Sequence, residues 1–283
     1  MKGGKPMDMK QIRKESELRE KRSYLVVKDN ELIQKAQFSL TAEQQKLVCY
    51  AVSLIKPTDE IFCHYEIKAT DFAELCGISP KHIYTDFKKM VDELDQKAFW
   101  VKMGDKTFKF RWFSEAEYIE KRGIIKIMLN SNIKQYLLQL KSNFTQYELW
   151  NILALKSKWS IRLYELFKSY EYQHRKTFEF EELKELLGSS YNLFGDFKRR
   201  ILDKAKEEIN LYSDINVEYE VKTVGKGHKV ESITFIITKK DNFDGYLAYR
   251  NTIEQINKRN KNRQIKGQLK LDDDLSIVEE EEI

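Results

Sequence analysis

Two stretches of the chain, separated by 110 positions, carry apolar residues at the three- and four-residue spacing of an amphipathic α-helix. They are copies of one pattern, because the tripeptide Asp-Phe-Lys occupies 86–88 in the first and 196–198 in the second. Lysine or arginine lies on the opposite face of each predicted helix. The apolar positions are Phe87, Val91 and Leu94 in the first stretch, and Phe197, Ile201, Ala205 and Ile209 in the second.

Each of these helices follows a shorter apolar-rich segment that ends in glycine. The first copy reads Phe72-Ala-Glu-Leu-Cys-Gly77, and the second reads Leu183-Lys-Glu-Leu-Leu-Gly188. Glycine supplies the left-handed residue that commonly ends a helix. In the first copy, Ser79 suits the cap of the next helix and Pro80 suits its first position. Each copy is therefore predicted to be a helix-turn-helix.

An alternating segment follows each helix-turn-helix. Residues 100–112 alternate about a Gly-Asp turn, as a β-hairpin does. After the second copy, 215–221 and 230–237 flank the tip 225–229. A helix-turn-helix followed by a hairpin is a winged helix. The predicted fold class is therefore α+β, with two tandem winged-helix domains.

A leading helix is predicted before each unit. The first covers 40–55 and begins with a capping box formed by Thr41 and Gln44, and the second covers 148–170. The predicted organisation is an N-terminal arm over 1–30, a first winged-helix domain over 31–143, a second over 144–248, and a tail over 249–283.

The distribution of charge points to a polyanionic partner. Seven acidic and no basic residues occupy 272–283, and without them the chain has 50 Lys and Arg against 38 Asp and Glu. A basic body suits phosphate contacts and counterion release. The basic stretch 258–270 and the acidic tail are expected to be unstructured. The tail either solubilises the chain or competes with DNA for the basic surfaces.

The cysteines and the apolar runs indicate a cytoplasmic protein. Cys49, Cys63 and Cys76 lack CxxC spacing and are expected to be three buried thiols in a reducing compartment. No apolar stretch approaches the ~18 residues of a membrane span, and residues 1–22 lack the apolar region of a signal peptide. No membrane partner is expected.

The second half of the chain resembles a known family. The run 157–166 is similar to the leading helix of iteron-binding plasmid replication initiators with two winged-helix domains, and 197–210 is similar to their second recognition helix. The run Ser-Asp-Ile at 213–215, followed by an alternating strand, also fits that family. The similarity covers roughly 30–240 and is strongest over 144–238.

This resemblance implies a mechanism. Family members bind repeated origin sequences, called iterons, as monomers, help to melt an adjacent AT-rich segment, and recruit the host helicase machinery. Dimers, formed mainly through the first domain, repress the initiator's own promoter. The expected partners are therefore double-stranded DNA at origin repeats and at that promoter, and host replication initiation proteins or helicase. A monomer–dimer equilibrium is also expected.

The second predicted recognition helix supplies the main candidates for DNA contact. Arg199 and Arg200 are assigned to base readout, because arginine pairs bidentately with guanine in the major groove. Lys198 and Lys204 are assigned to phosphates, which position the protein without specifying sequence. The alternative interpretation is an ordinary solvated basic face, but the repeated helix-turn-helix and the basic wing favour DNA contact.

Further candidates lie on the second wing and in the first domain. In the first domain, four acidic residues dilute the positive charge of the predicted recognition helix: Asp86, Asp92, Glu93 and Asp95. The second domain is therefore expected to contribute more affinity. A flexible exposed turn is the alternative interpretation of the wing tip. The wing candidates are Lys222, Lys226, His228 and Lys229, and the first-domain candidates are Lys81, His82, Tyr84, Lys88 and Lys89.

The sequence offers no catalytic constellation, so the protein is expected not to be an enzyme. His64, His82, His174 and His228 lack the spacing of a metal site, and no P-loop is present. No metal or cofactor is expected. Two alternatives stay open, a winged-helix transcriptional repressor without origin function and a nicking initiator that uses an unrecognised tyrosine.

Overall fold

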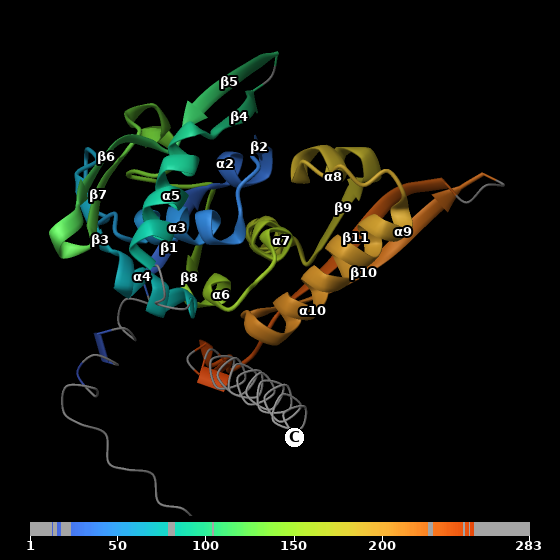
Figure 1. The fold of residues 1–283 in the computed structure, drawn as a ribbon. Helices are drawn as coiled ribbons and strands as arrows, with labels where there is room; N and C mark the ends of the chain where they lie inside the picture. Colours follow the sequence, from blue (N-terminus) through green and yellow to red (C-terminus); the bar gives the residue numbers. More distant parts are fainter. Residues whose placement is uncertain are drawn as a thin grey trace, which may run out of the picture.

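The computed structural model consists of two mixed helix-and-strand units with the helix α7 (Lys158–Ser169) between them (Figure 1). No helix among the residues described is long and apolar enough to cross a membrane. The basic stretch 258–270 and the acidic tail lie outside the described part of the chain. The structure describes residues 13, 16–17, 24–78, 83–103, 105–225, 229–245, 247–248 and 250–251.

The first unit is built on an antiparallel sheet with the strand order β3-β7-β6. The predicted leading helix is α3, and Thr41 and Gln44 form the predicted capping box at its start. Alternate residues of the strand β3, Tyr65 and Ile67, are buried against the helices. The elements are α3 (Ala42–Ser53), β3 (His64–Lys68), α4 (Ala69–Cys76), α5 (Ile83–Gln96), β6 (Phe113–Ile119) and β7 (Ile124–Leu129).

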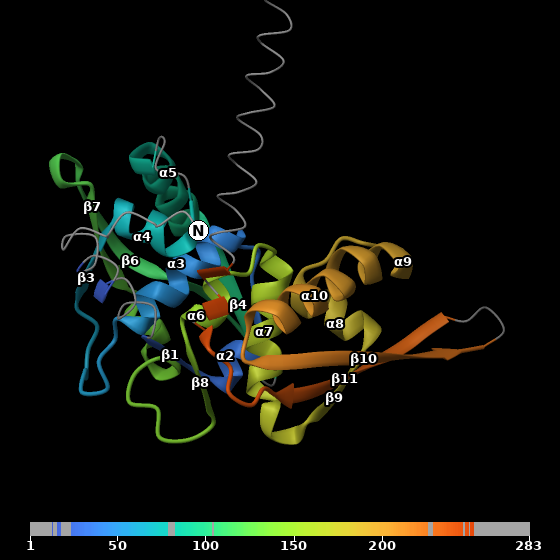
Figure 2. The same cartoon turned by 90° about the horizontal axis from the view of Figure 1, so that it is seen from below.

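The second unit repeats this arrangement with the strand order β10-β11-β9. Its β10–β11 hairpin extends away from the rest of the molecule in both ribbon views (Figures 1 and 2). After α7, the elements are β9 (Arg175–Glu179), α8 (Phe180–Leu187), α9 (Phe194–Phe197), a π-helical turn (Lys198–Leu202), α10 (Asp203–Tyr212), β10 (Ile215–Val224) and β11 (Lys229–Lys239).

Both units follow the order helix, strand, helix, helix, two strands, and in both the last strand is central in the sheet. Gly77 and Gly188 end α4 and α8 in the left-handed conformation, with φ of 66° and 58°. Ile78 and Ser189 donate backbone hydrogen bonds back into these helices, as in a Schellman motif. The predicted α+β fold with two tandem winged helices is confirmed. The predicted cap at Ser79 and Pro80 lies outside the described residues.

The hairpin predicted over 100–112 is present, but it is not the wing of the first unit. Its strands, β4 (Ala98–Met103) and β5 (Lys106–Arg111), form a separate sheet with β2 (Ala36–Gln37). The strands β6 and β7, joined through the 3-10 turn η1 (Glu120–Arg122), take the place that β10 and β11 take in the second unit. Alternation predicts a hairpin, but it does not say which sheet the hairpin joins.

The single helix predicted over 148–170 is wrong, because the chain breaks between α6 (Trp150–Leu153) and α7. Within the break, one carboxylate oxygen of Glu208 accepts hydrogen bonds from the backbone N–H groups of Lys156, at 3.0 Å, and Ser157, at 3.1 Å. The Ser157 side chain then caps α7. A carboxylate from α10 thus satisfies the backbone where the helix is interrupted. Apolar periodicity cannot reveal such a long-range contact.

The N-terminal part of the described chain is tied to the middle of the sequence. The strands β1 and β8 pair along their whole length, and this pairing joins residues on both sides of the boundary predicted between 143 and 144. The domain limits themselves stay a prediction. The remaining elements are β1 (Leu25–Asp29), α2 (Asn30–Lys35), η2 (Ser131–Tyr136), β8 (Phe144–Glu148) and η3 (Glu171–Gln173).

The three cysteines lie in different environments. Cys49 on α3 is buried, as predicted, whereas Cys76 is half-buried and Cys63 is exposed. The prediction of three buried thiols is therefore wrong. Cys63 lies in the loop between α3 and β3, where no packed element covers it.

Candidate nucleic-acid interface

The helix of the second helix-turn-helix runs from α9 through the π-helical turn into α10. The residues predicted to form its core face, Phe197, Ile201, Ala205 and Ile209, are completely buried. The ring of Phe197 meets that of Phe180 on α8 edge-to-face, with the centroids 5.2 Å apart. This packing fixes the helix on the body of the unit, and its opposite face is exposed to solvent.

The π-helical turn contains three of the predicted DNA-contacting residues, Lys198, Arg199 and Arg200. It is closed by a hydrogen bond from the backbone N–H of Asp203 to the carbonyl of Lys198. Wider turns of this kind are rare and frequently occur at functional sites. Here the two adjacent residues Ile201 and Leu202 are both buried, while the basic side chains before them are exposed.

Arg199 and Arg200 share one carboxylate partner, Asp196, one turn earlier on the helix. A guanidinium nitrogen of Arg199 lies 2.7 Å from Asp196 Oδ1, and Nε of Arg200 lies 3.6 Å from the same oxygen. The hydrogen bond from Arg199, together with the charge of Arg200, lowers the pKa of Asp196. The arginine side chains are 69% and 55% exposed. They are thus oriented by a carboxylate but open to a ligand.

The two predicted phosphate-binding lysines of this helix differ in their surroundings. Lys198 Nζ lies 2.9 Å from a carboxylate oxygen of Asp203, and this hydrogen bond raises the pKa of Lys198. Tyr219 on β10 donates its hydroxyl to the same carboxylate. Lys204 is exposed. Lys198 is therefore held toward the wing, whereas Lys204 points into solvent.

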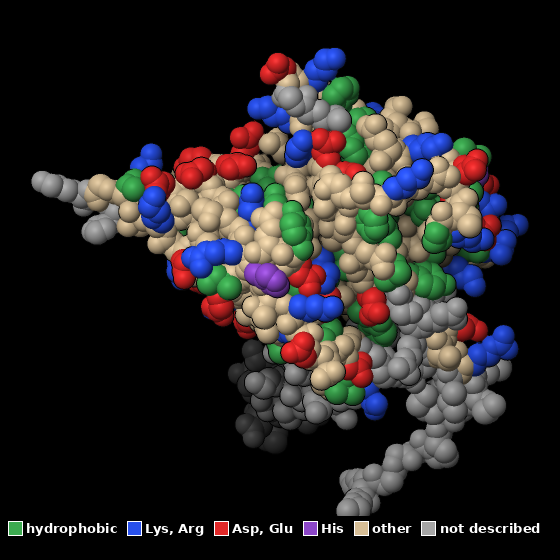
Figure 3. Space-filling view, turned by 180° about the vertical axis from the view of Figure 1, so that it is seen from behind, with side chains coloured by type: hydrophobic (Ala, Val, Ile, Leu, Met, Phe, Trp, Pro, Cys, Tyr) green, Lys and Arg blue, Asp and Glu red, His purple; other side chains and the backbone are tan. Residues whose placement is uncertain are grey.

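The predicted wing is present as the β10–β11 hairpin. Lys222 is exposed and forms an ion pair with Glu231 across the two strands, at 2.5 Å, and Lys229 is exposed at the start of β11. Gly225 has a φ of 73° and makes the turn after β10. Lys226 and His228 lie outside the described residues. In the space-filling view from behind, basic and acidic side chains are interspersed, including on this hairpin (Figure 3).

The corresponding helix of the first unit, α5, carries two lysines among four acidic residues. Lys88 lies 3.4 Å from a carboxylate oxygen of Glu120 and 5.0 Å from the centre of the Tyr118 ring. Tyr84 is 56% exposed, and Lys89 is exposed. The remaining candidates of this unit, Lys81 and His82, lie outside the described residues. The two helices therefore present different surfaces on the same scaffold.

Two family models cover most of this architecture. The model described as "Initiator Replication protein, WH1" matches residues 25–168, and the model described as "Initiator Rep protein, WH2" matches 179–237. The chain belongs to this family of replication initiators. The first match includes α3 and all but the last residue of α7, and the second includes the helix-turn-helix of the second unit, β10, and β11 as far as Ile237.

Individual initiators and related proteins are similar to this chain over most of its length. A replication initiation protein of Escherichia coli is 26% identical over 206 residues, which cover 68% of this chain and 64% of that protein. An uncharacterized 27.6 kDa protein of Escherichia coli is 27% identical over 217 residues, covering 71% and 91% respectively. The crystal structure of the Pi initiator protein in complex with iteron DNA superposes with a TM-score of 0.64 at 21% identity, covering 78% of this chain and 99% of that one.

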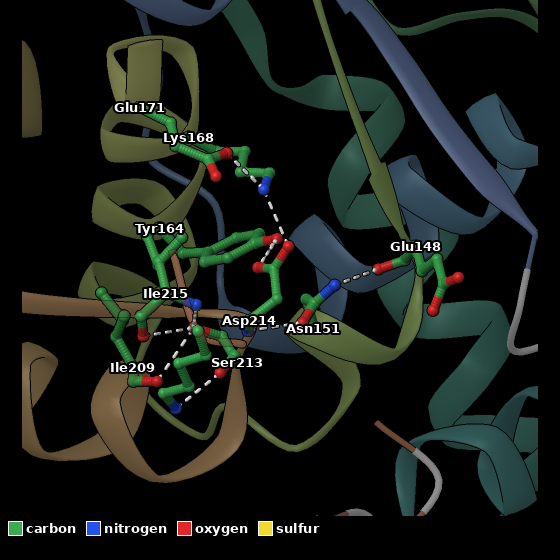
Figure 4. A network of polar contacts seen from close by, with 10 residues as sticks. Glu148, Asn151, Tyr164, Lys168, Glu171, Ile209, Ser213, Asp214 and Ile215 are labelled. Atoms are coloured by element: carbon green, nitrogen blue, oxygen red, sulfur yellow. Dashed lines mark hydrogen bonds and ion pairs between the residues drawn. The ribbon is translucent and has the colours of Figure 1, made fainter. Parts of the chain in front are cut away.

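A polar network fixes the wing of this initiator to the centre of the molecule (Figure 4). The carboxylate of Asp214, just before β10, accepts hydrogen bonds from the Tyr164 hydroxyl at 2.9 Å and from Lys168 Nζ at 2.7 Å. Its backbone N–H donates to Asn151 Oδ1 at 2.9 Å. Burial acts to lower the pKa of Lys168, but the Asp214 and Glu171 carboxylates together outweigh it and raise the pKa. The network ties α6 and α7 to the corner between α10 and β10.

Sequence reasoning missed several features of this surface. The role of Asp196 in orienting both arginines was not predicted, although its spacing of three and four residues from them is the spacing at which helix side chains meet. The π-helical turn was not predicted either. Leu193, exposed just before α9, was also missed. An apolar residue outside the helical periodicity was the available signal. Among the described residues, no group of three His, Cys, Asp or Glu side chains could hold a metal ion.

Gly123, at the tip of the first wing, allows a close approach by Tyr84. Its φ is 59°, and a Cβ atom there would lie 2.1 Å from Cε1 of the Tyr84 ring. We expect Gly123→Ala to lower the free energy of unfolding by roughly 2 kcal/mol. An alanine there would combine backbone strain of about 1 kcal/mol, from the left-handed conformation, with a steric clash against the Tyr84 ring. Urea denaturation measures this loss.

Gly188→Ala is the matched control, because Gly188 has a similar φ of 58° but its Cβ would meet only the Phe38 carbonyl oxygen, at 3.9 Å. It should lose about 1 kcal/mol, from backbone strain alone. In a Tyr84→Ala background, the cost of Gly123→Ala should fall to the same value. An unchanged cost in that background would show that the Tyr84 ring does not cause the loss.

Proposed function

We propose that this chain is a plasmid replication initiator that binds direct repeats at its origin as a sequence-specific double-stranded DNA-binding protein. The observation that carries the proposal is the pair of exposed arginines, Arg199 and Arg200, on a packed recognition helix in the second of two winged helices. Family membership and the fold shared with the iteron-bound Pi initiator support it.

The recognition helix would lie in the major groove, where each base pair presents its own pattern of donors and acceptors. Arg199 and Arg200 would leave Asp196 and pair with guanine, exchanging one charge-assisted hydrogen bond for another. Lys198, Lys204 and the wing lysines, Lys222 and Lys229 among them, would contact phosphates and set the register. The second domain would thus be the main reader.

The first domain has a different task in this proposal. Glu120 pairs with Lys88, and the other lysine of α5, Lys89, lies among the four acidic residues of that helix. This domain would make auxiliary DNA contacts and mediate dimerisation, and the dimer would repress the initiator's own promoter. Bound monomers would open the adjacent origin DNA and bring host replication proteins to it. No DNA strand is cut in this scheme.

A gel-shift experiment tests the proposal with DNA from just upstream of the coding sequence. Two winged helices read successive major-groove faces, so each direct repeat should span about 20 base pairs. Fragments with one, two and three repeats should give one, two and three discrete complexes, and fragments with scrambled repeats should give none at the same protein concentration. A single complex on an inverted repeat would instead indicate a dimeric repressor. Cleavage of a supercoiled origin with a divalent metal would indicate a nicking initiator.

A further inference from the structure

Leu193 is a large apolar side chain that the fold leaves in solvent at the start of the recognition helix. It is 71% exposed, and its carbonyl accepts backbone hydrogen bonds from Asp196 and Phe197 at 3.1 Å each. It therefore lies one turn before the carboxylate that orients Arg199 and Arg200. An exposed leucine alone needs no explanation, but this one occupies the end of the helix that enters the major groove in winged helices.

The neighbours of Leu193 are anchored, so its exposure is not that of a loose loop. Phe194 packs edge-to-face on Phe180, with the ring centroids 5.4 Å apart, and Tyr191 packs against the core. The guanidinium of Arg200 lies 5.7 Å from the centre of the Tyr191 ring. The Leu193 side chain is thus presented outward from a fixed backbone, at the start of the helix that carries the arginines.

Gly195 leaves the backbone at the same end of the helix without a side chain over it. Nothing lies within 4 Å of the place where its Cβ would be, so its backbone is open to a close approach by a ligand. A leucine beside a bare backbone offers dispersion and apolar contact but no hydrogen bond. In the major groove, the only apolar group that a base pair presents is the C5-methyl of thymine.

We propose that Leu193 is a specificity-determining residue that contacts the C5-methyl group of a thymine next to the bases read by Arg199 and Arg200. This inference rests on the proposed function. Removing one methyl group from such a contact costs about 0.8 kcal/mol of transfer free energy, or about fourfold in affinity. The contact would select thymine over cytosine and over uracil at one position in each repeat.

The test replaces thymines of a single-repeat duplex by deoxyuridine, one position at a time, and measures affinity for the wild type and Leu193→Ala. At one position we expect deoxyuridine to weaken wild-type binding about fourfold and to change Leu193→Ala binding less than 1.5-fold. On the unmodified repeat, Leu193→Ala should bind about fourfold more weakly than the wild type. Leu211→Ala is the matched control, because Leu211 is 56% exposed at the far end of the same helix, and it should respond like the wild type.

Three outcomes would overturn the inference. If every deoxyuridine substitution affects both proteins equally, Leu193 does not contact a thymine methyl group. If Leu193→Ala weakens binding to all duplexes, scrambled ones included, by one common factor, the side chain acts without reading sequence. If the wild type does not distinguish the repeat from a scrambled duplex, the proposed function itself fails and the inference falls with it. The first two results leave repeat binding by the wild type intact, which separates them from the third.

Discussion

We expect Arg199→Ala and Arg200→Ala each to lower the affinity for an origin repeat by roughly ten- to a hundredfold, because the bidentate arginine–guanine contact proposed for each is worth about 1–3 kcal/mol. Binding to scrambled DNA falls much less, since each change removes only one of several phosphate-attracting charges. Both side chains are exposed and form ion pairs with Asp196, so neither change opens a cavity in the core. Gel shifts at fixed salt, on repeat and scrambled duplexes, measure both affinities.

Arg175→Ala is the matched control for this prediction. Arg175 on β9 is also a largely exposed arginine, 58% accessible, with one carboxylate partner, Glu220. It pairs in register with Ile236, toward the base of β11 and away from the tip of the wing. Its loss should change repeat affinity less than twofold. If Arg175→Ala were as damaging as Arg199→Ala, net charge and not base readout would explain the effect.

The fold was predictable because its signals are local and occur twice. Gly77 and Gly188 mark the ends of two helices by a backbone conformation that few other residues adopt. The apolar spacing from Phe197 to Ile209 fixes which face of the recognition helix is buried. By elimination it also fixes the face on which Arg199 and Arg200 lie. Local rules therefore placed the main candidate residues on one exposed surface.

The features that escaped prediction depend on contacts between distant parts of the chain. The helix break before Ser157 exists because Glu208, on another helix, receives the freed backbone N–H groups. A regular helix, at about 100° per residue, already places Ile201 and Leu202 on the face opposite Arg199 and Arg200, so no residue pattern in this stretch indicates the π-helical turn. Which hairpin completes the first winged helix depends on strand pairing with β3. None of these three features can be predicted from one segment of the sequence alone.

The helix α7 makes polar contacts with residues of both units. From α7, Arg162 donates a hydrogen bond at 2.7 Å to the carbonyl of Ala36, which belongs to β2 of the first unit. Tyr164 and Lys168 on the same helix hold Asp214 at the start of the second wing. A change in the packing of α7 would therefore reach both units. Another polar contact of this helix is a buried ion pair between Glu165 and Lys28.

Glu165→Ala lowers the free energy of unfolding by about 3–5 kcal/mol, because it leaves the ammonium group of Lys28 buried without its counter-charge. Lys28 Nζ lies 2.6 Å from Glu165 Oε1, and the two side chains are only 5% and 3% exposed. The Tyr147 hydroxyl also donates to this carboxylate, at 2.6 Å, so two buried donors lose their acceptor. Urea denaturation at neutral pH measures the loss.

Two variants test whether the unpaired charge is the cause. Glu31→Ala removes a carboxylate from a more exposed pair with Lys35 and should cost less than about 1 kcal/mol. Lys28→Met combined with Glu165→Leu removes both charges and should recover most of the stability that Glu165→Ala loses. If the double variant were as unstable as Glu165→Ala, lost packing and not the buried ammonium would explain the result.

The same pair predicts how stability depends on pH. Burial acts to raise the pKa of Glu165, but Lys28 outweighs it and lowers the pKa. Burial acts to lower the pKa of Lys28, but the Cys49 and Glu165 groups outweigh it and raise the pKa. Stabilisation by Glu165 is therefore present above the ordinary glutamate pKa and lost as the pH falls through the lowered value. Stabilisation by Lys28 is present below the ordinary lysine pKa and lost as the pH rises through the raised value.

The wild type and the double variant Lys28→Met/Glu165→Leu differ only at this pair. The difference between their unfolding free energies therefore isolates the pH dependence of the pair and of the groups in contact with it. It should be constant across neutral pH and should shift in favour of the double variant at both acidic and strongly alkaline pH. The neighbouring Cys49 thiol, whose pKa burial raises to about 11, stays protonated across neutral pH and adds no charge to the pair there. A difference that did not change with pH would show that folding does not shift the pKa values of Glu165 and Lys28.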